Sequence, residues 1–106
     1  MIQTQRIGQS KGKRRVTLWN RALNAAGFPA GTRIAILADT VAHDLTILPD
    51  LDGPRKVSAV KNHGNDLPVI DLKENGKLDL SHLGDIGGNV TVSIQPGIIT
   101  ITRKVN

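Results

Sequence analysis

The sequence predicts a mostly β fold made of two similar halves that pack on each other. Short apolar runs bounded by turn residues are typical of strands. Eleven glycines and five prolines in 106 residues favour frequent turns over long helices. Trp19 and Phe28 are the only aromatic residues, so the core must be built from aliphatic side chains. A chain of this length predicts a single domain.

The first half combines a short helix with two strands. Asn20 is a suitable N-cap for a helix over residues 21–26, and Gly27 can end it in a left-handed conformation. Leu23 and Ala26 would then face the core. After a turn at Pro29, the predicted strands cover residues 33–38 and 45–48.

The second half repeats this plan after a linker at residues 50–66, which includes a short strand at 56–60. Asn75 and Gly76 form a strong tight-turn signal, and Ser81 can cap a single helical turn. The predicted strands cover residues 69–72, 90–94 and 99–101.

The two halves, residues 16–49 and 67–104, match at nearly constant spacing. Residues 31–36 correspond to 87–92 at a spacing of 56, and residues 45–47 correspond to 99–101 at a spacing of 54. Each half is below the size at which a lone domain usually folds, so the halves must pack together. A chance likeness between short hairpins is the alternative explanation.

These residues resemble a known superfamily. The runs 76–78, 83–92 and 97–101 resemble the AbrB swapped-hairpin DNA-binding module, whereas Leu23, residues 26–31, Ile34 and Ile36 are similar to its SymE branch. The resemblance implies a small AbrB-like swapped-hairpin β-barrel, formed by two tandem halves as a pseudo-dimer with one short helix in each half. A tandem protein of this size also resembles the phage-encoded single-stranded DNA-binding transcription cofactors known as Drc.

The second half departs from the AbrB pattern in two ways. Its helix is shortened, and it carries Asp71, Glu74, Asp79 and Asp85 where AbrB-type dimers present arginines as a symmetric pair. This departure argues against symmetric reading of a palindromic duplex.

The charges are distributed unevenly along the chain. Residues 1–38 hold seven basic and no acidic side chains, whereas the remaining residues hold seven basic and nine acidic ones, a balance of +7 against −2. This asymmetry predicts a polyanionic partner for the N-terminal part. Residues 1–15 read as an exposed basic arm whose first residues can form an edge strand. The alternative is a solvated tail that aids solubility.

The candidate nucleic-acid-binding residues lie in this basic part. Residues 11–15 contain four cations, Lys11, Lys13, Arg14 and Arg15. Such a cluster can bind successive backbone phosphates without contacting the bases. Trp19 would add a stacking platform for unpaired bases, unless it belongs to the core. Phe28 is more typical of a core residue. The full set of predicted binding residues is Arg6, Lys11, Lys13, Arg14, Arg15, Trp19, Arg21 and Arg33.

Catalysis and metal binding have little support in the sequence. The chain has no cysteine, which excludes disulfides and thiolate chemistry. His43, His63 and His82 have no metal-ligand spacing, and no cofactor is expected. His43 with Asp44, or His63 with Asp66, could serve an RNA-cleaving activity of the SymE type, although no nucleophile or base pair emerges.

The sequence therefore predicts a non-enzymatic protein that binds single-stranded DNA without strong sequence preference, in phage transcription regulation or DNA replication. One alternative is an AbrB-type regulator that binds double-stranded DNA, and another is an inhibitor of a host protein. The absence of a long apolar run predicts a cytoplasmic protein with no membrane contact. Other expected partners are a second copy in a dimer or tetramer and an RNA polymerase or replication protein.

Overall fold

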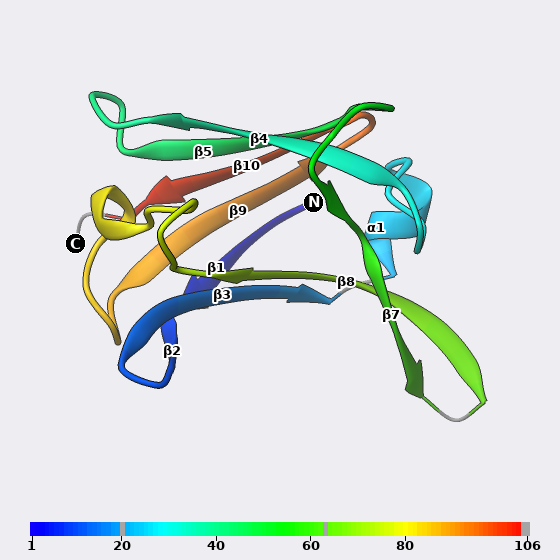
Figure 1. Cartoon of the computed structure of the whole chain (residues 1–106), viewed down its shortest axis with the longest axis horizontal. Coiled ribbons are helices and arrows are strands. Elements are labelled where there is room, and N and C mark those ends of the chain that lie inside the picture. The colour runs from blue at the N-terminus through cyan, green and yellow to red at the C-terminus, as the bar shows by residue number, and fades with distance from the viewer. Residues whose placement is uncertain (20, 63, 105–106) are drawn as a thin grey trace.

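Strands predominate in the computed structural model, which describes residues 1–19, 21–62 and 64–104 (Figure 1). The strands are β1 (Ile2–Arg6), β2 (Gly8–Ser10), β3 (Lys13–Trp19), β4 (Arg33–Asp39), β5 (Asp44–Pro49), β6 (Arg55–Lys56), β7 (Ser58–Asn62), β8 (Asn65–Lys73), β9 (Asn89–Gln95) and β10 (Ile98–Arg103). The helical elements are the single turn α1 (Ala22–Ala25) and the 3-10 turn η1 (Ser81–Leu83). The predicted mostly β class is therefore confirmed.

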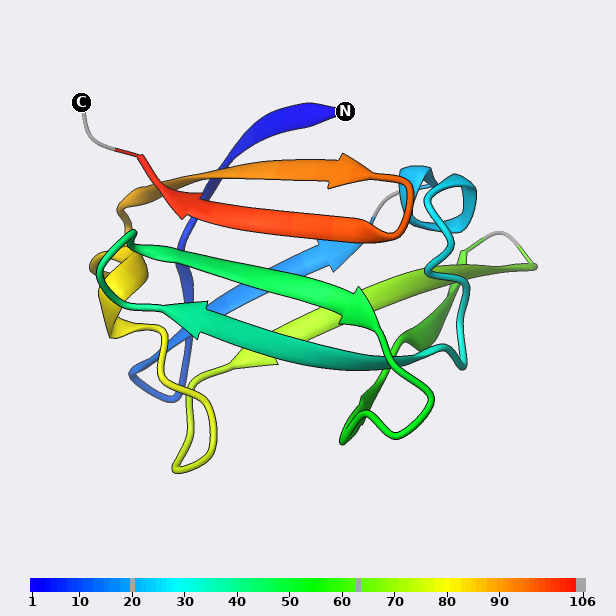
Figure 2. The same ribbon diagram turned by 90° about the horizontal axis from the view of Figure 1, so that it is seen from above.

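The strands form two antiparallel sheets that face each other. Sheet A has the order β1-β9-β10-β5-β4-β6, and sheet B has the order β2-β3-β8-β7. Figure 2 shows β3 and β8 crossing beneath the strands of sheet A at an angle. The described strands form no closed barrel, and the expected swapped-hairpin barrel is not confirmed.

At two of the four places where the chain passes between the sheets, a single buried residue forms the corner. Ile7 lies between β1 and β2, where its backbone N–H donates to Gly88 O at 2.8 Å and its carbonyl accepts from Gly87 N at 2.8 Å. Val57 lies between β6 and β7, and its N–H donates to Thr32 O at 2.9 Å. These corners connect the sheets through paired backbone rather than through free loops.

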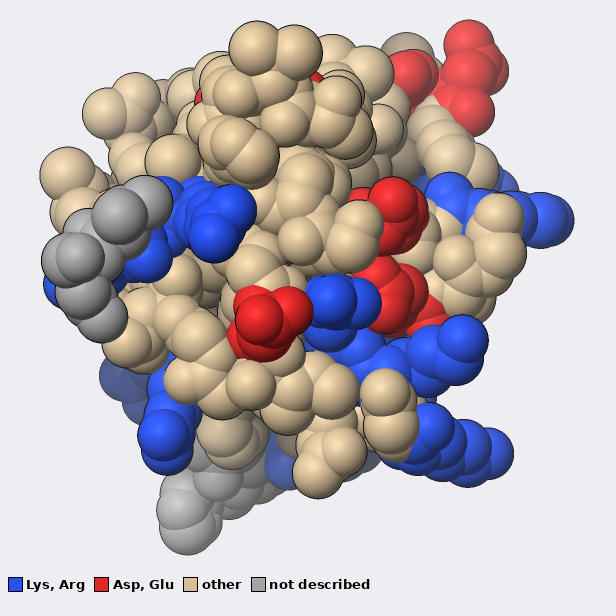
Figure 3. Space-filling view, turned by 90° about the vertical axis from the view of Figure 1, so that its left-hand side faces the viewer, with Lys and Arg blue, Asp and Glu red and all other residues tan. Residues whose placement is uncertain are grey.

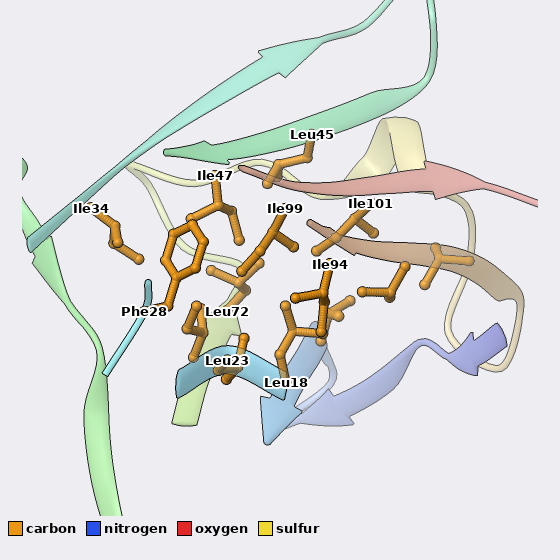
Figure 4. Packing of buried hydrophobic residues seen from close by; sticks show 14 of the residues in the cluster. Leu18, Leu23, Phe28, Ile34, Leu45, Ile47, Leu72, Ile94, Ile99 and Ile101 are labelled. Carbon is orange, nitrogen blue, oxygen red and sulfur yellow. The ribbon is translucent and has the colours of Figure 1, made fainter. Parts of the chain in front are cut away.

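The core fills the space between the inner faces of the two sheets. Figure 4 shows Phe28 among aliphatic side chains from both sheets, including Ile34, Ile47 and Leu72. Phe28 is completely buried, which confirms its prediction as a core residue. Because burying one such side chain stabilises a fold by about 1.5–3 kcal/mol, this aliphatic core is the main source of stability.

The strands predicted at 33–38, 45–48, 69–72, 90–94 and 99–101 are confirmed, and each is one to five residues longer than predicted. The helix is present as the single turn Ala22–Ala25, with Ala26 as its C-cap, and Gly27 follows with a φ of +93°, which suits glycine. Leu23 and Ala26 face the core as expected. The predicted N-cap, Asn20, lies outside the described residues. Ser81 does not cap η1; instead its N–H donates to Asp79 Oδ1 at 2.8 Å.

The basic segment at residues 1–15 does not form a separate arm. Its first residues pair with β9 as the edge strand of sheet A, and Lys13–Arg15 begin β3, which is an inner strand of sheet B. Likewise, residues 50–66 contain β6, β7 and the start of β8 rather than a linker. The edge strand expected at the start of the chain is present as β1, and the strand expected at 56–60 is present as β6 and β7, divided at Val57. The remaining residues of both segments are ordered by backbone pairing, although they have few apolar side chains of their own.

The strand registers of the two halves repeat each other. Ile36 lies opposite Ile47 in the first hairpin, as Val92 lies opposite Ile101 in the second. At the junction of the hairpins, Thr46 pairs with Thr100, which is the residue 54 positions later. Thr17 pairs with Asp71 in sheet B at the same offset. Pairing of a residue with its own counterpart in both sheets is what a local two-fold axis requires.

Candidate nucleic-acid interface

The outer face of sheet B carries the most distinctive surface of the described chain. Because successive strand residues point to opposite faces, burial of Val16 and Leu18 places their neighbours on the outside. The outward residues of β3 are Lys13, Arg15, Thr17 and Trp19. Across the β3–β8 ladder, Lys73, Asp71 and Val69 lie opposite Arg15, Thr17 and Trp19 respectively. The face is thus cationic at one end and apolar at the other.

An open groove of about 470 Å³ runs across this face between β3, β8 and β7. Its lining residues are Arg15, Thr17, Trp19, Ser58, Val60, Val69 and Asp71. Every one of them comes from a strand, so the position of each side chain is fixed by backbone pairing. A groove held by strands needs little rearrangement to receive a ligand.

Trp19 is exposed at the apolar end of the groove. Its exposed fraction is 65 %, and Val60, also partly exposed at 43 %, lines the same groove from β7. The sequence left open whether Trp19 is a core residue or a surface platform, and the structure places it on the surface. An exposed indole beside apolar side chains offers a flat surface on which a base can stack.

Arg15 and Asp71 form a bidentate ion pair at the cationic end of the groove. Arg15 Nε donates to Asp71 Oδ1 and its NH2 donates to Oδ2, both at 2.9 Å. Thr17 Oγ1 donates to the same Oδ1 at 3.0 Å. The hydrogen bond from Arg15 is the main cause that lowers the pKa of Asp71, with Thr17 and the charges of Arg15 and Lys73 adding to it. Asp71 is therefore ionised at neutral pH, and it partly neutralises the cationic end of the groove.

Three lysines extend the cationic end beyond Arg15. Lys11, Lys13 and Lys73 line a second hollow of about 360 Å³ together with Glu74. Lys11 occupies the left-handed turn of the β2–β3 hairpin, with φ of 52°, followed by Gly12 at 78°. Lys13 and Lys11 make no ion pair in the part of the chain that the structure describes. Their ammonium groups are therefore available to an external anion.

Arg14 is bound within the protein instead. It points to the opposite face of β3, where its Nε donates to Gly84 O at 2.7 Å and its NH1 donates to Glu74 Oε1 at 3.0 Å. Its NH2 lies 3.4 Å from Asp85 Oδ1. Figure 3 shows that Lys and Arg on this end of the molecule are interspersed with Asp and Glu. Arg14 thus fastens the loop before β9 to sheet B.

The remaining predicted binding residues lie apart from the groove. Arg6 is on β1 opposite Asn89 in sheet A, and Arg21 precedes α1. Arg33 is on β4, where its NH1 donates to Gly53 O at 2.9 Å. Lys73 and Lys56 were missed by the sequence analysis, because only the strand register places them beside Arg15 and Arg33.

The histidines are not assembled into a reactive site. His82 is buried, and its Nε2 lies 2.9 Å from Asp44 O. His43 Nδ1 lies 3.2 Å from His82 O, which ties the β4–β5 turn to η1. His63 lies outside the described residues. Among residues 1–19, 21–62 and 64–104, no group of three or more potential metal ligands gathers.

Within the described residues, no helix has the length and apolarity needed to cross a membrane. Comparisons of the chain with protein-family models, curated proteins and solved structures find no match.

Proposed function

We propose that this chain is a non-enzymatic protein that binds single-stranded DNA along the outer face of sheet B, without strong sequence preference. The observation that carries the proposal is the exposed indole of Trp19 in a groove whose other end carries Arg15. Lys13 and Lys73 extend the cationic surface from there. One end of the face can stack a base, and the other can hold backbone phosphates.

Stacking on Trp19 favours a single strand over a duplex. In a duplex the bases are stacked on each other, and their faces are closed to a protein side chain. An unpaired base on an aromatic ring contributes about 1–3 kcal/mol, whatever its identity. Lysines that contact phosphates increase the affinity, and this contribution decreases as the salt concentration rises. Phosphate contacts do not distinguish one base sequence from another. The combination suits a general single-strand binder in phage transcription or replication, acting in the host cytoplasm.

The proposal extends to the origin of the fold. The equal 54-residue offset of Thr46 with Thr100 and of Thr17 with Asp71 supports two fused halves related by a local axis. The resemblance to AbrB and SymE sequences supports a pseudo-dimeric relative of that superfamily. Strand β1 leaves an open edge with Ile2 exposed, which supports pairing between chains in a dimer or tetramer.

Fluorescence anisotropy with a labelled oligonucleotide, as a single strand and as a duplex, tests the function at two salt concentrations. We expect tighter binding to the single strand, a steep loss of affinity with salt, and quenching of Trp19 emission on binding. Preference for the duplex would instead support an AbrB-type regulator. Saturable single-strand binding with unchanged Trp19 emission would remove the groove from the interface.

A further inference from the structure

A second pocket lies next to the groove, around the corner formed by Val57. Its volume is about 520 Å³, and its lining residues are Gly31, Thr32, Arg33, Pro49, Asp50, Leu51 and Lys56. Lys56 and Ser58 flank the corner residue, and Ser58 lines the groove that holds Trp19. Two residues of extended chain span about 7 Å, so the two pockets adjoin each other.

Arg33 and Lys56 place two positive charges side by side in this pocket. They are direct partners in the antiparallel β4–β6 pair, and both are exposed on the same side. Like charges directly opposite each other destabilise a strand pair. Neither residue has an ion-pair partner in the described part of the chain. An anion bound between them would remove this repulsion.

The acidic residue of the pocket is already engaged by its own loop. Asp50 Oδ1 accepts the N–H of Asp52 at 2.9 Å, and the Asp50 carbonyl accepts the N–H of Gly53 at 2.9 Å. These bonds shape the loop and hold the carboxylate in a turn. The Asp50 carboxylate makes no ion pair with Arg33 or Lys56 in the described part of the chain, although the Asp50 backbone N–H donates to Arg33 O at 2.9 Å.

Arg33 is also held in place before any ligand arrives. Its NH1 donates to the carbonyl of Gly53 at 2.9 Å. Gly53 packs directly against the backbone of Ile34, where a Cβ atom would overlap the Ile34 carbonyl group. A guanidinium anchored at one nitrogen presents its other donors in a defined plane, which suits the oxygens of a phosphate group.

We infer that Arg33 and Lys56 bind a backbone phosphate of the same DNA strand whose base stacks on Trp19. This inference rests on the proposed function. It extends the surface that the DNA strand contacts from sheet B, around the corner at Val57, onto sheet A. The DNA strand would therefore follow the outer face of β3, pass Ser58, and reach the β4–β6 pair.

Oligothymidylates of about 4 and about 16 nucleotides, which span the site sizes of small single-strand-binding folds, test this path. Lys56→Ala should leave binding of the short oligonucleotide unchanged and weaken binding of the long one several-fold. The slope of log affinity against log salt should fall by about 0.7 for the phosphate lost. Lys56→Glu should weaken the long complex further. Lys104→Ala removes the same charge from an exposed lysine at the end of β10 and serves as the control.

Each outcome separates the inference from the proposed function. If Lys56→Ala binds the long oligonucleotide as tightly as the unchanged protein, the phosphate site is wrong although single-strand binding stands. The same conclusion follows if Lys104→Ala causes an equal loss, because the effect would then reflect net charge alone. If the unchanged protein binds neither oligonucleotide, both the proposed function and the phosphate site are wrong.

Discussion

Arg15 and Asp71 lie on neighbouring strands and share two hydrogen bonds of 2.9 Å on the outer face of sheet B. The pair stands in the groove that contains Trp19. The arginine that is best placed to meet a phosphate is therefore restrained by a carboxylate. On the proposed function, a DNA phosphate would either use the donors that remain on Arg15 or compete with Asp71 for it.

Replacing Asp71 by Asn should strengthen DNA binding. The change removes one negative charge from the groove and frees Arg15 for a phosphate, so affinity should rise several-fold. The salt slope should become steeper by about 0.7 if one further phosphate is engaged. Anisotropy titrations at several salt concentrations measure both quantities. Weaker binding would indicate that Asp71 contacts the ligand or positions Arg15 for it.

The stability of the same variant should depend on pH differently from that of the unchanged protein. The hydrogen bond from Arg15 lowers the pKa of Asp71 in the folded protein. The ionised Asp71 carboxylate therefore stabilises the fold at pH values above the ordinary aspartate pKa of about 3.9. That contribution is lost as the pH falls through the lower pKa of the folded state. The Tm of the unchanged protein should therefore fall more steeply than that of Asp71→Asn between about pH 5 and about pH 1.

Parallel Tm curves for the two proteins would contradict this expectation. Asp79 also has a lowered pKa, because Ser81 donates to it through its side chain and its backbone N–H. Asp79 is unchanged in the variant, so the difference between the two curves isolates Asp71.

Trp19→Ala should weaken binding without affecting the fold. Loss of one stacked base costs about 1–3 kcal/mol, which corresponds to roughly a 5- to 150-fold lower affinity. Because Trp19 is 65 % exposed, the Tm should change little. Val41→Ala, at an 88 % exposed apolar residue between β4 and β5, is the matched control and should bind normally. Equal binding by Trp19→Ala and Val41→Ala would exclude stacking.

The neighbours Lys13 and Arg14 should separate binding from stability. Lys13→Ala removes an outward cation without an ion pair among the described residues, so it should lower DNA affinity and leave the Tm unchanged. Arg14→Ala leaves Gly84 O and Glu74 without their partner, and it should destabilise the fold by about 2 kcal/mol. Thermal unfolding and anisotropy of both variants measure this contrast. Equal Tm values would show that the Arg14 contacts contribute little.

Gly53→Ala should destabilise the protein strongly. A Cβ atom at this position would lie 2.2 Å from Ile34 O and 2.5 Å from Ile34 C, so the backbone must shift, at a cost of about 3 kcal/mol or more. Gly76→Ala is the control, because a Cβ atom there meets nothing within 4 Å. Denaturant unfolding of the two variants should differ clearly, and similar midpoints would contradict the packing at Gly53.

The central strands could be predicted because their own residues determine them. In residues 33–38 and 90–94, branched and apolar side chains alternate strongly enough to indicate strands without knowledge of their partners. The alternation of Arg15, Val16, Thr17, Leu18 and Trp19 also held the signal that Trp19 points outward. Because two of the five face the core, the other three must share the opposite face.

The N-terminal strands and the site partners could not be predicted in the same way. The order of residues 1–15 depends on pairing with β9 and on the contacts of Arg14 with Glu74 and Gly84, which are 60 and 70 residues away. The proximity of Arg33 to Lys56 likewise follows from the register of a two-residue strand. A single sequence contains no local signal for such long-range contacts.

The repeated strand register bears on the direction in which a DNA strand can lie across the outer face of sheet B. In a symmetric dimer, each residue of the outer face would recur on the other side of the axis, and a strand could lie in either direction. Here Trp19 corresponds to Lys73, and Arg15 corresponds to Val69, at the 54-residue offset that Thr17 and Asp71 define. On the proposed pseudo-dimeric origin, one chain encodes both halves, so each half can change alone and the face can become directional. A DNA strand with its base on Trp19 and its phosphates on Arg15 and Lys73 would then run in a single 5′-to-3′ sense.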